Sequence, residues 1–204
     1  VVKNRFGSTD EIGIFEMRKN GLQPVDNPSE IFISQGRRVS AGSTIISCME
    51  GTRALLVEIQ ALVARANFGM PERKVSGVDY NRVSMLLAIL EKRIGLKLGG
   101  QDIFVNIVGG VQIDEPAADL GIAMTIASSF KEKVIPSDIV FDGEVGLGGE
   151  VRSVSQIEIR LKEAQRLGFK RAVIPKDNAK GIGKELGIER IEVCYLSEAV
   201  EIIG

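Results

Sequence analysis

The chain has 204 residues, of which 44% are hydrophobic and 26% are charged, and its formal net charge is −1. These values are ordinary for one sizeable globular domain, and no apolar run approaches the roughly 20 residues of a membrane-spanning helix. We therefore expect a cytoplasmic protein with no membrane partner. Because the net charge gives no general attraction to nucleic acid, DNA binding would require basic residues gathered on one surface.

The sequence contains no histidine and only two cysteines, Cys48 and Cys194. The lack of histidine excludes Ser-His-Asp and Cys-His catalysis, so any chemistry would use carboxylates, a lysine or a supplied metal. Two thiols make a poor metal site and no disulfide framework, so we predict no bound metal and two buried or half-buried thiols. Two tyrosines and no tryptophan argue against base stacking as the main way of binding DNA.

The first 42 residues predict little regular structure. They begin in mid-pattern without a methionine, which we interpret as a fragment of a longer protein. Residues 1–7 read as a strand end and a turn, and residues 13–17 as a short strand. A connector is expected over residues 21–28, where Asn27-Pro28 is typical of a turn. Ser29 is expected to cap a very short helix, ahead of a polar stretch over residues 34–42.

The pattern then changes to β and afterwards alternates. Residues 43–49 and 53–64 predict a hairpin with Gly51 in its loop, and residues 67–77 predict a loop. Asp79 is a plausible N-cap for an amphipathic helix that Gly95 ends. The apolar face of that helix would consist of Val83, Leu86, Leu87, Leu90 and Ile94, with Arg82 mainly on the exposed side. A strand buried on both faces follows at residues 103–108, and a helix begins near Pro116 and runs to Phe130.

The last third of the chain continues this alternation. Strands are expected over residues 139–147, 170–174 and 191–195, and helices over residues 155–167 and 177–186, with a final short helix capped by Ser197. Ile157, Leu161 and Ala164 would form the buried face of the helix that Gly168 stops. The glycine-rich residues 143–149 lack the Lys-Ser/Thr ending of a phosphate-binding loop, which favours a tight β-turn. This order indicates an α+β fold with α/β-type alternation.

Two segments resemble the proteolytic domain of the Lon family: DEPAADLGIAM at residues 114–124, and the stretch from Asp142-Gly143-Glu144 to Val173-Ile174-Pro175. The resemblance implies the fold shared with the second domain of ribosomal protein S5. At the family's serine and lysine positions stand Asp119 and Glu158. A Ser-Lys dyad needs a hydroxyl nucleophile and a neutral amine, so no catalytic residues are expected and peptidase activity is disfavoured. The two carboxylates are either structural, in first helical turns, or ligands of a divalent cation.

The beginning of the chain resembles a second family, the bacterial recombination and repair family RadA (Sms). The signature pentapeptide is Lys3-Asn4-Arg5-Phe6-Gly7, and RKVSGVDYNR at residues 73–82 and QDIFVNIVGG at residues 101–110 are also similar. The resemblance covers nearly the whole chain. It implies that residues 1–28 are the end of a RecA-like ATPase domain and that residues 29–204 form an inactive Lon-protease-like domain. The zinc-binding cysteines and the phosphate-binding loop of the family are not in this sequence.

This second resemblance implies a DNA-dependent ATPase or helicase that processes branched recombination intermediates together with the RecA recombinase. The fragment would be non-catalytic and would serve as a hexamerisation scaffold and a DNA-binding surface for single-stranded or branched duplex DNA. No cofactor is expected in the fragment, whereas ATP, Mg²⁺ and Zn²⁺ would belong to the full-length protein. The candidate DNA-binding residues are basic: Lys3, Arg5, Arg65, Arg73, Lys74, Arg82 and Arg152. Two alternatives remain, an oligomerisation module without DNA contact and a Lon-like peptidase.

Overall fold

The hairpin predicted from residues 43–64 forms the middle of the largest sheet. Strand β3 (Ser43–Glu50) pairs antiparallel with β4 (Arg53–Arg65), in a register that runs from Ser43 opposite Gln60 to Glu50 opposite Arg53. Strand β4 is rich in valine, isoleucine and leucine, and consecutive residues 44–48 of β3 and 54–59 of β4 are buried, as expected for strands that are covered on two faces. The turn uses Gly51 at φ 59°, a left-handed conformation that costs glycine little. The hairpin prediction is confirmed.

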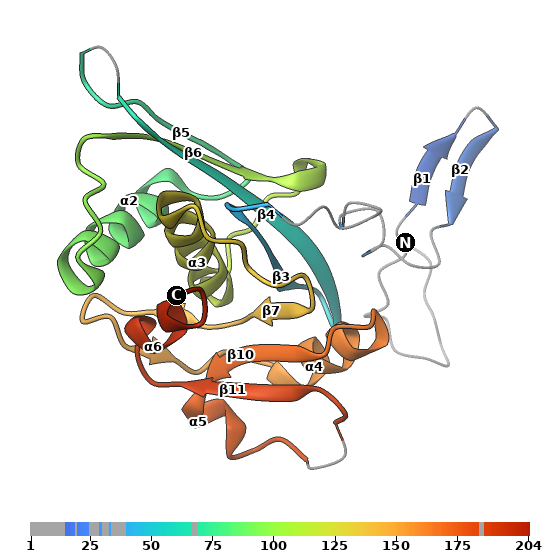
Figure 1. Ribbon diagram of the computed structural model, residues 1–204. Helices are drawn as coiled ribbons and strands as arrows, with labels where there is room; N and C mark the ends of the chain where they lie inside the picture. The colour runs from blue at the N-terminus through green and yellow to red at the C-terminus, as the bar shows by residue number, and fades with distance from the viewer. Residues whose placement is uncertain are drawn as a thin grey trace.

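The structure is a computed structural model that describes residues 15–18, 20–24, 29, 33, 40–66, 69–183 and 186–204. Seven strands form a mixed sheet in the order β11-β10-β7-β3-β4-β6-β5 (Figure 1). The pairs β11–β10, β10–β7, β7–β3 and β6–β5 are parallel, and β4 is antiparallel to both of its neighbours. The other five strands of this sheet are β5 (Arg73–Ser76), β6 (Gln101–Ile107), β7 (Ile139–Phe141), β10 (Arg171–Pro175) and β11 (Glu189–Val193).

Helices cover the two faces of this sheet unequally. One face carries α2 (Tyr80–Ile89), α3 (Asp119–Lys131) and α6 (Leu196–Glu201), and the other carries α4 (Ile157–Arg166); a short α5 (Lys176–Ala179) lies against β10 and β11. Side chains alternate between the two cores, so Leu55 and Val57 pack on the α3 side and Leu56 on the α4 side. The prediction of a mixed α/β fold is confirmed.

Helix α3 runs through the centre of the larger core, and its residues 119–129 are all buried. A 3₁₀ turn, Pro116–Ala118, precedes it. The close approach of α3 to the sheet depends on Gly121, because a Cβ atom there would lie 2.0 Å from Cγ2 of Ile46. The contact between Gly121 and Ile46 therefore sets the position of the first turn of α3 against β3.

The helix predicted after Asp79 is also confirmed. The Asp79 carboxylate accepts a hydrogen bond from the Arg82 backbone N–H at 2.8 Å, and Val83, Leu86, Leu87 and Leu90 are buried. A π-helical turn, Leu90–Ile94, extends α2 until Gly95 ends it at φ 80°.

Several other boundaries were predicted wrongly. Strand β5 forms inside the expected loop 67–77, and β2 (Gly21–Pro24) forms inside the expected connector, paired with β1 (Phe15–Arg18). The strand expected over residues 139–147 ends at Phe141 and resumes as β8 (Glu144–Val145), which pairs with β9 (Val151–Arg152). Strand β6 is buried on one face only, because α4 does not extend over that part of the sheet.

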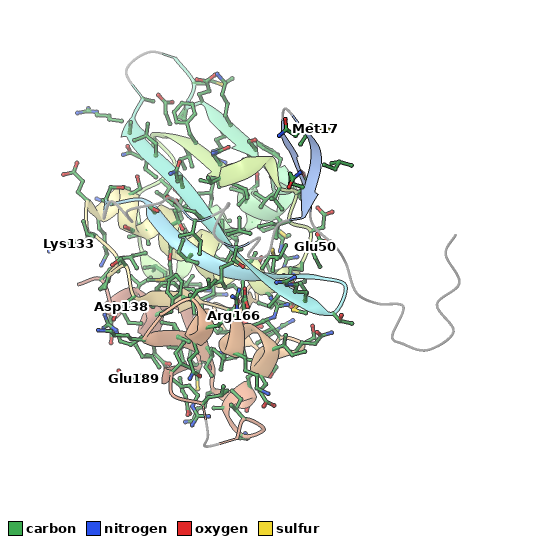
Figure 2. All side chains as sticks on the ribbon, turned by 90° about the vertical axis from the view of Figure 1, so that its right-hand side faces the viewer. Met17, Glu50, Lys133, Asp138, Arg166 and Glu189 are labelled. Atoms are coloured by element: carbon green, nitrogen blue, oxygen red, sulfur yellow. The ribbon has the colours of Figure 1, made fainter. Side chains whose placement is uncertain are left out.

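The C-terminal helices also differ from the expectation. The helix expected over residues 177–186 is the single turn α5, and Ser197 lies inside the first turn of α6, which has no side-chain cap. None of the described helices is both long and apolar enough to cross a membrane. The pentapeptide Lys3–Gly7, the helix expected after Ser29 and residues 34–39 lie outside the described residues. The β1–β2 hairpin stands beside the main sheet, with Met17 at the margin of the molecule (Figure 2).

Candidate functional site

A cleft of about 300 Å³ lies between helix α2, the start of α3 and the β8–β9 hairpin. Helix α2 contributes Arg82, Met85, Leu86 and Ile89, and α3 contributes Asp119. The hairpin supplies Glu144 and Val145, the turn that joins the strands, and then Glu150 and Arg152. The cleft therefore contains Asp119, the residue that the resemblance to the Lon family aligned with the serine of a peptidase.

The carboxylate of Asp119 accepts three hydrogen bonds, two from Arg82 and one from Val145. Arg82 donates through Nε to Oδ1 and through Nη2 to Oδ2, the latter at 2.5 Å, and the Val145 N–H donates to Oδ2 at 3.1 Å. Only 1% of Asp119 is exposed, whereas 28% of the Arg82 side chain is exposed. Burial raises the pKa of Asp119, and the hydrogen bonds to Asp119 raise the pKa of Arg82. This bidentate pair leaves no free nucleophile or base at the floor of the cleft.

The rim of the cleft is formed by charges on the β8–β9 hairpin. Arg152 Nη2 lies 2.5 Å from Glu150 Oε1, whereas its Nη1 lies 3.8 Å from Glu144 Oε1. The joining turn is closed by a hydrogen bond from Gly149 N–H to Gly146 O at 2.8 Å. From outside the cleft, Arg93 Nε donates to the Leu147 carbonyl at 3.3 Å. The tight turn predicted from the glycines is confirmed.

Glu158, at the lysine position of the peptidase, is not among the residues that line the cleft. It lies in the first turn of α4, 48% exposed, and its Oε1 is 2.8 Å from Lys162 Nζ one turn later. The contacts in the structure therefore give Asp119 and Glu158 separate partners, Arg82 and Lys162. Among the described residues, no three Cys, Asp or Glu side chains gather closely enough to hold a metal ion. Both carboxylates therefore belong to ion pairs with basic side chains.

A second group of polar residues, which the sequence did not predict, surrounds the fully buried Arg160, although the Glu115 side chain in it is 25% exposed. Arg160 of α4 has no exposed surface and pairs with Glu115 at 2.5 and 3.1 Å. It also donates to the carbonyls of Ser47 at 2.6 Å and Ser155 at 3.0 Å, and its Nη1 lies 3.9 Å from Asp142 Oδ1. The sequence offered one sign of this group, because Arg160 falls on the apolar side of the helix predicted over residues 155–167. This group ties α4 to β3 and to the segment that leads into α3.

Asp142 lies between Arg160 and Ser47 and is completely buried. Its Oδ1 accepts from Ser47 Oγ at 2.5 Å, and its Oδ2 has no partner among the described groups. Burial raises the pKa of Asp142 from 3.8 to about 6, although Arg160 and Ser47 favour the charged form. Nearby Cys48 is buried too, and burial raises the pKa of its thiol to about 12, so it is unreactive. Cys48 buried and Cys194 half-buried agree with the prediction for the two thiols.

The proposed DNA-binding residues in the described part of the chain lie in three places. Arg82 and Arg152 belong to the cleft, where carboxylates pair with both. Arg65 and Arg73 flank β6, opposite Gln101 and Ile103 respectively. Strand alternation places both on the sheet face that carries α2 and α3. Lys74 points to the opposite face, and its Nζ lies 2.7 Å from Glu72 Oε1.

A further basic residue, Lys133, was missed by the sequence analysis. It is exposed just after α3 (Figure 2). Ser128 Oγ of α3 donates a hydrogen bond to the Lys133 carbonyl oxygen, and Ser129 Oγ of α3 accepts one from the N–H of Val63 on β4. Lys133 and the end of β4, which carries Arg65, are therefore both attached to the C-terminal end of α3. Lys3 and Arg5 lie outside the described residues.

Comparison with known proteins gives the chain a family. It is 56% identical over 199 residues to a protein of Bacillus subtilis named DNA repair protein RadA. The match covers 98% of this chain and 43% of that protein. Proteins of the same name from Listeria monocytogenes and Halalkalibacterium halodurans are 54% and 53% identical over 98% of this chain. The chain spans less than half the length of these relatives. The family model described as subunit ChlI of Mg-chelatase matches residues 60–178, which is more than half of the chain, and the chain belongs to that family.

Proposed function

We propose that this chain is the scaffold and DNA-binding part of a longer protein of DNA repair and homologous recombination. The observation that carries this proposal is the 56% identity to a protein named DNA repair protein RadA over 98% of the chain. The longer protein would be a DNA-dependent ATPase or helicase that processes branched intermediates with the RecA recombinase, using ATP, Mg²⁺ and Zn²⁺ outside this segment. This chain would hold the subunits of a hexameric ring together in the cytoplasm.

The geometry of the cleft supports a non-catalytic role. Asp119 occupies the nucleophile position and is bound by Arg82 and Val145, while Glu158 pairs with Lys162 on the exposed side of α4. Three of the roughly four lone pairs of the Asp119 carboxylate already accept hydrogen bonds, two of them from a guanidinium, so this carboxylate is poorly placed to attack or deprotonate a substrate. The Lon-like shape then serves as a framework for the surfaces around it.

The surface that best fits DNA is the end of the sheet marked by Arg65, Arg73 and Lys133. Arg65 and Arg73 share one face across β6, and Lys133 is attached to the same end of α3 as β4. Of these residues Arg65 and Lys133 are exposed and Arg73 is half-buried, and basic groups at one end of a sheet neutralise backbone phosphates without reading the base sequence. Arg82, Arg152 and Lys74 already have carboxylate partners and are expected to contribute less.

Reversing both arginines tests this assignment. The double variant Arg65→Glu/Arg73→Glu is expected to bind duplex and single-stranded DNA more weakly than the unmodified chain. Its salt dependence should flatten by about 1.8 in log–log slope, since each lost phosphate contact contributes about 0.9. The control Lys162→Glu/Lys180→Glu changes the net charge equally but at two solvent-exposed ion pairs on α4 and just after α5. If the two variants show the same affinity and slope, this DNA-binding surface is wrong.

Light scattering of the chain with and without duplex DNA separates the alternatives. An oligomerisation module without DNA contact forms a ring whose mass does not change with DNA. A DNA-binding scaffold gains the mass of the duplex in a salt-dependent manner. A peptidase that uses a cation held by Asp119 and Glu158 would cleave casein only when metal is added, which their separate ion pairs disfavour.

A further inference from the structure

The cleft beside Asp119 is not used by the DNA-binding role, and its walls are suited to an apolar group. Its volume of about 300 Å³ is at the lower end of the range for small-molecule sites, so it admits one or two side chains. Leu86 and Ile89 of α2 form an apolar floor that is almost completely buried. Met85 and Leu147 flank the opening and are 47% and 69% exposed.

These two exposed side chains are unusual for a soluble surface because they flank a hollow rather than a flat region. A single exposed apolar residue needs no explanation, but two that border one cavity provide a continuous apolar contact. Methionine is flexible and polarizable, and it adapts to side chains of different shape. Burial of Met85 and Leu147 under an apolar group of a partner would therefore be favourable, and partner side chains of different shape could make this contact.

The charges of the cleft do not oppose such an occupant. Asp119 is neutralised by Arg82, and Glu150 lies 2.5 Å from Arg152, so docking of an apolar group leaves neither charge unpaired. Glu144 is different, because its ion pair with Arg152 is 3.8 Å long and 34% of its side chain is exposed. This carboxylate is available to a cation that approaches the rim.

We propose that the cleft binds an extended segment of a partner protein that carries a bulky aliphatic residue next to a lysine or arginine. The aliphatic side chain enters between Met85 and Leu147, and the neighbouring cation pairs with Glu144. No bond is cut, because Asp119 is bound by Arg82. This inference is independent of DNA binding and rests on the walls of the cleft alone.

Methyl NMR of the whole chain tests this proposal, because the methyl group of Met85 reports on the cleft and those of the other methionines serve as references. The five methionines are Met17, Met49, Met70, Met85 and Met124. The probe is a terminally blocked peptide, Gly-Gly-Leu-Lys-Gly-Gly. It should shift the Met85 methyl signal saturably and leave that of Met70, which is 90% exposed on a distant loop, unchanged. A peptide with glutamate in place of lysine should bind about 2- to 5-fold more weakly, the size of one exposed ion pair. Alanine in place of leucine should weaken binding about 10-fold or more.

Variants of the protein assign the two contacts separately. Leu147→Asp should weaken binding of the leucine-lysine peptide about 10-fold, whereas Leu62→Asp, a control at a leucine that is 60% exposed on β4, should not. Glu144→Gln should remove the preference for lysine over glutamate and keep the preference for leucine over alanine. The proposal is overturned if Met85 shows no saturable shift, or if Met70 shifts equally. It is also overturned if Met85 shifts with protein concentration alone, which would mean that a second copy fills the cleft.

Discussion

Replacing Arg160 with methionine removes the centre of the buried polar group while keeping most of the side-chain volume. Arg160 has no exposed surface, and it bonds to both oxygens of Glu115 and to the carbonyls of Ser47 and Ser155. Methionine fills the space but donates no hydrogen bond. Glu115, the two carbonyls and the buried carboxylate of Asp142 would all lose their cationic partner.

The expected cost follows from burial. Removing one member of a buried ion pair leaves an uncompensated charge and costs about 3 to 5 kcal/mol of unfolding free energy. At a pH below the Asp142 pKa of about 6, protonation of Asp142 removes one of the stranded charges, so the loss should be smaller there. The matched control is Arg171→Met, because Arg171 makes a similar two-bond pair with Asp138 and the two side chains are 31% and 30% exposed. An exposed pair of this kind is worth about 0.2 to 1 kcal/mol.

Urea unfolding followed by circular dichroism at pH 7.5 measures both variants against the unmodified chain. A lower midpoint with an unchanged slope would report a change in stability rather than in the denatured state. If Arg160→Met costs less than about 1 kcal/mol, or no more than Arg171→Met, then the buried group does not hold α4 to β3 as described.

Two further predictions concern the same core. Burial raises the pKa of Asp142 above its unfolded value, so its contribution to stability is present below pH 3.8 and is lost as the pH rises through about 6. Between pH 4 and pH 7 the unmodified chain should therefore lose up to about 3 kcal/mol relative to Asp142→Asn, and a difference independent of pH would contradict this. Gly121→Ala should destabilise by about 1 to 3 kcal/mol in thermal unfolding because its Cβ would meet Ile46 at 2.0 Å, although alanine is the better helix former. Gly181→Ala, with open space around it, is the control, and equal effects would refute the steric argument.

Local patterns in the sequence determined those elements whose signals lie within a few residues. Two apolar runs separated by a glycine-containing loop at Gly51 predicted the β3–β4 hairpin, and the Asp79 cap with apolar residues at three- and four-residue spacing predicted α2. The sequence also showed an aspartate at position 119, where the resemblance to the Lon family implied that a peptidase would carry its serine. Strand β5 was missed because its four residues carry no apolar period and are ordered only by pairing with β6.

The role of the polar residues was decided by the tertiary structure. Arg82 looked like an exposed helical base, but it is bound to Asp119, which lies 37 residues further along the chain. Arg160 was not singled out from the sequence, but in the structure it is fully buried and pairs with Glu115, 45 residues earlier in the chain, whose side chain is 25% exposed. Periodicity reports which side chains share a face, and only the packing of separate elements reports which charges meet. The sequence by itself therefore determined that a carboxylate stands at position 119, near the start of a helix, and only the tertiary structure determined that Arg82 and the Val145 N–H bind it.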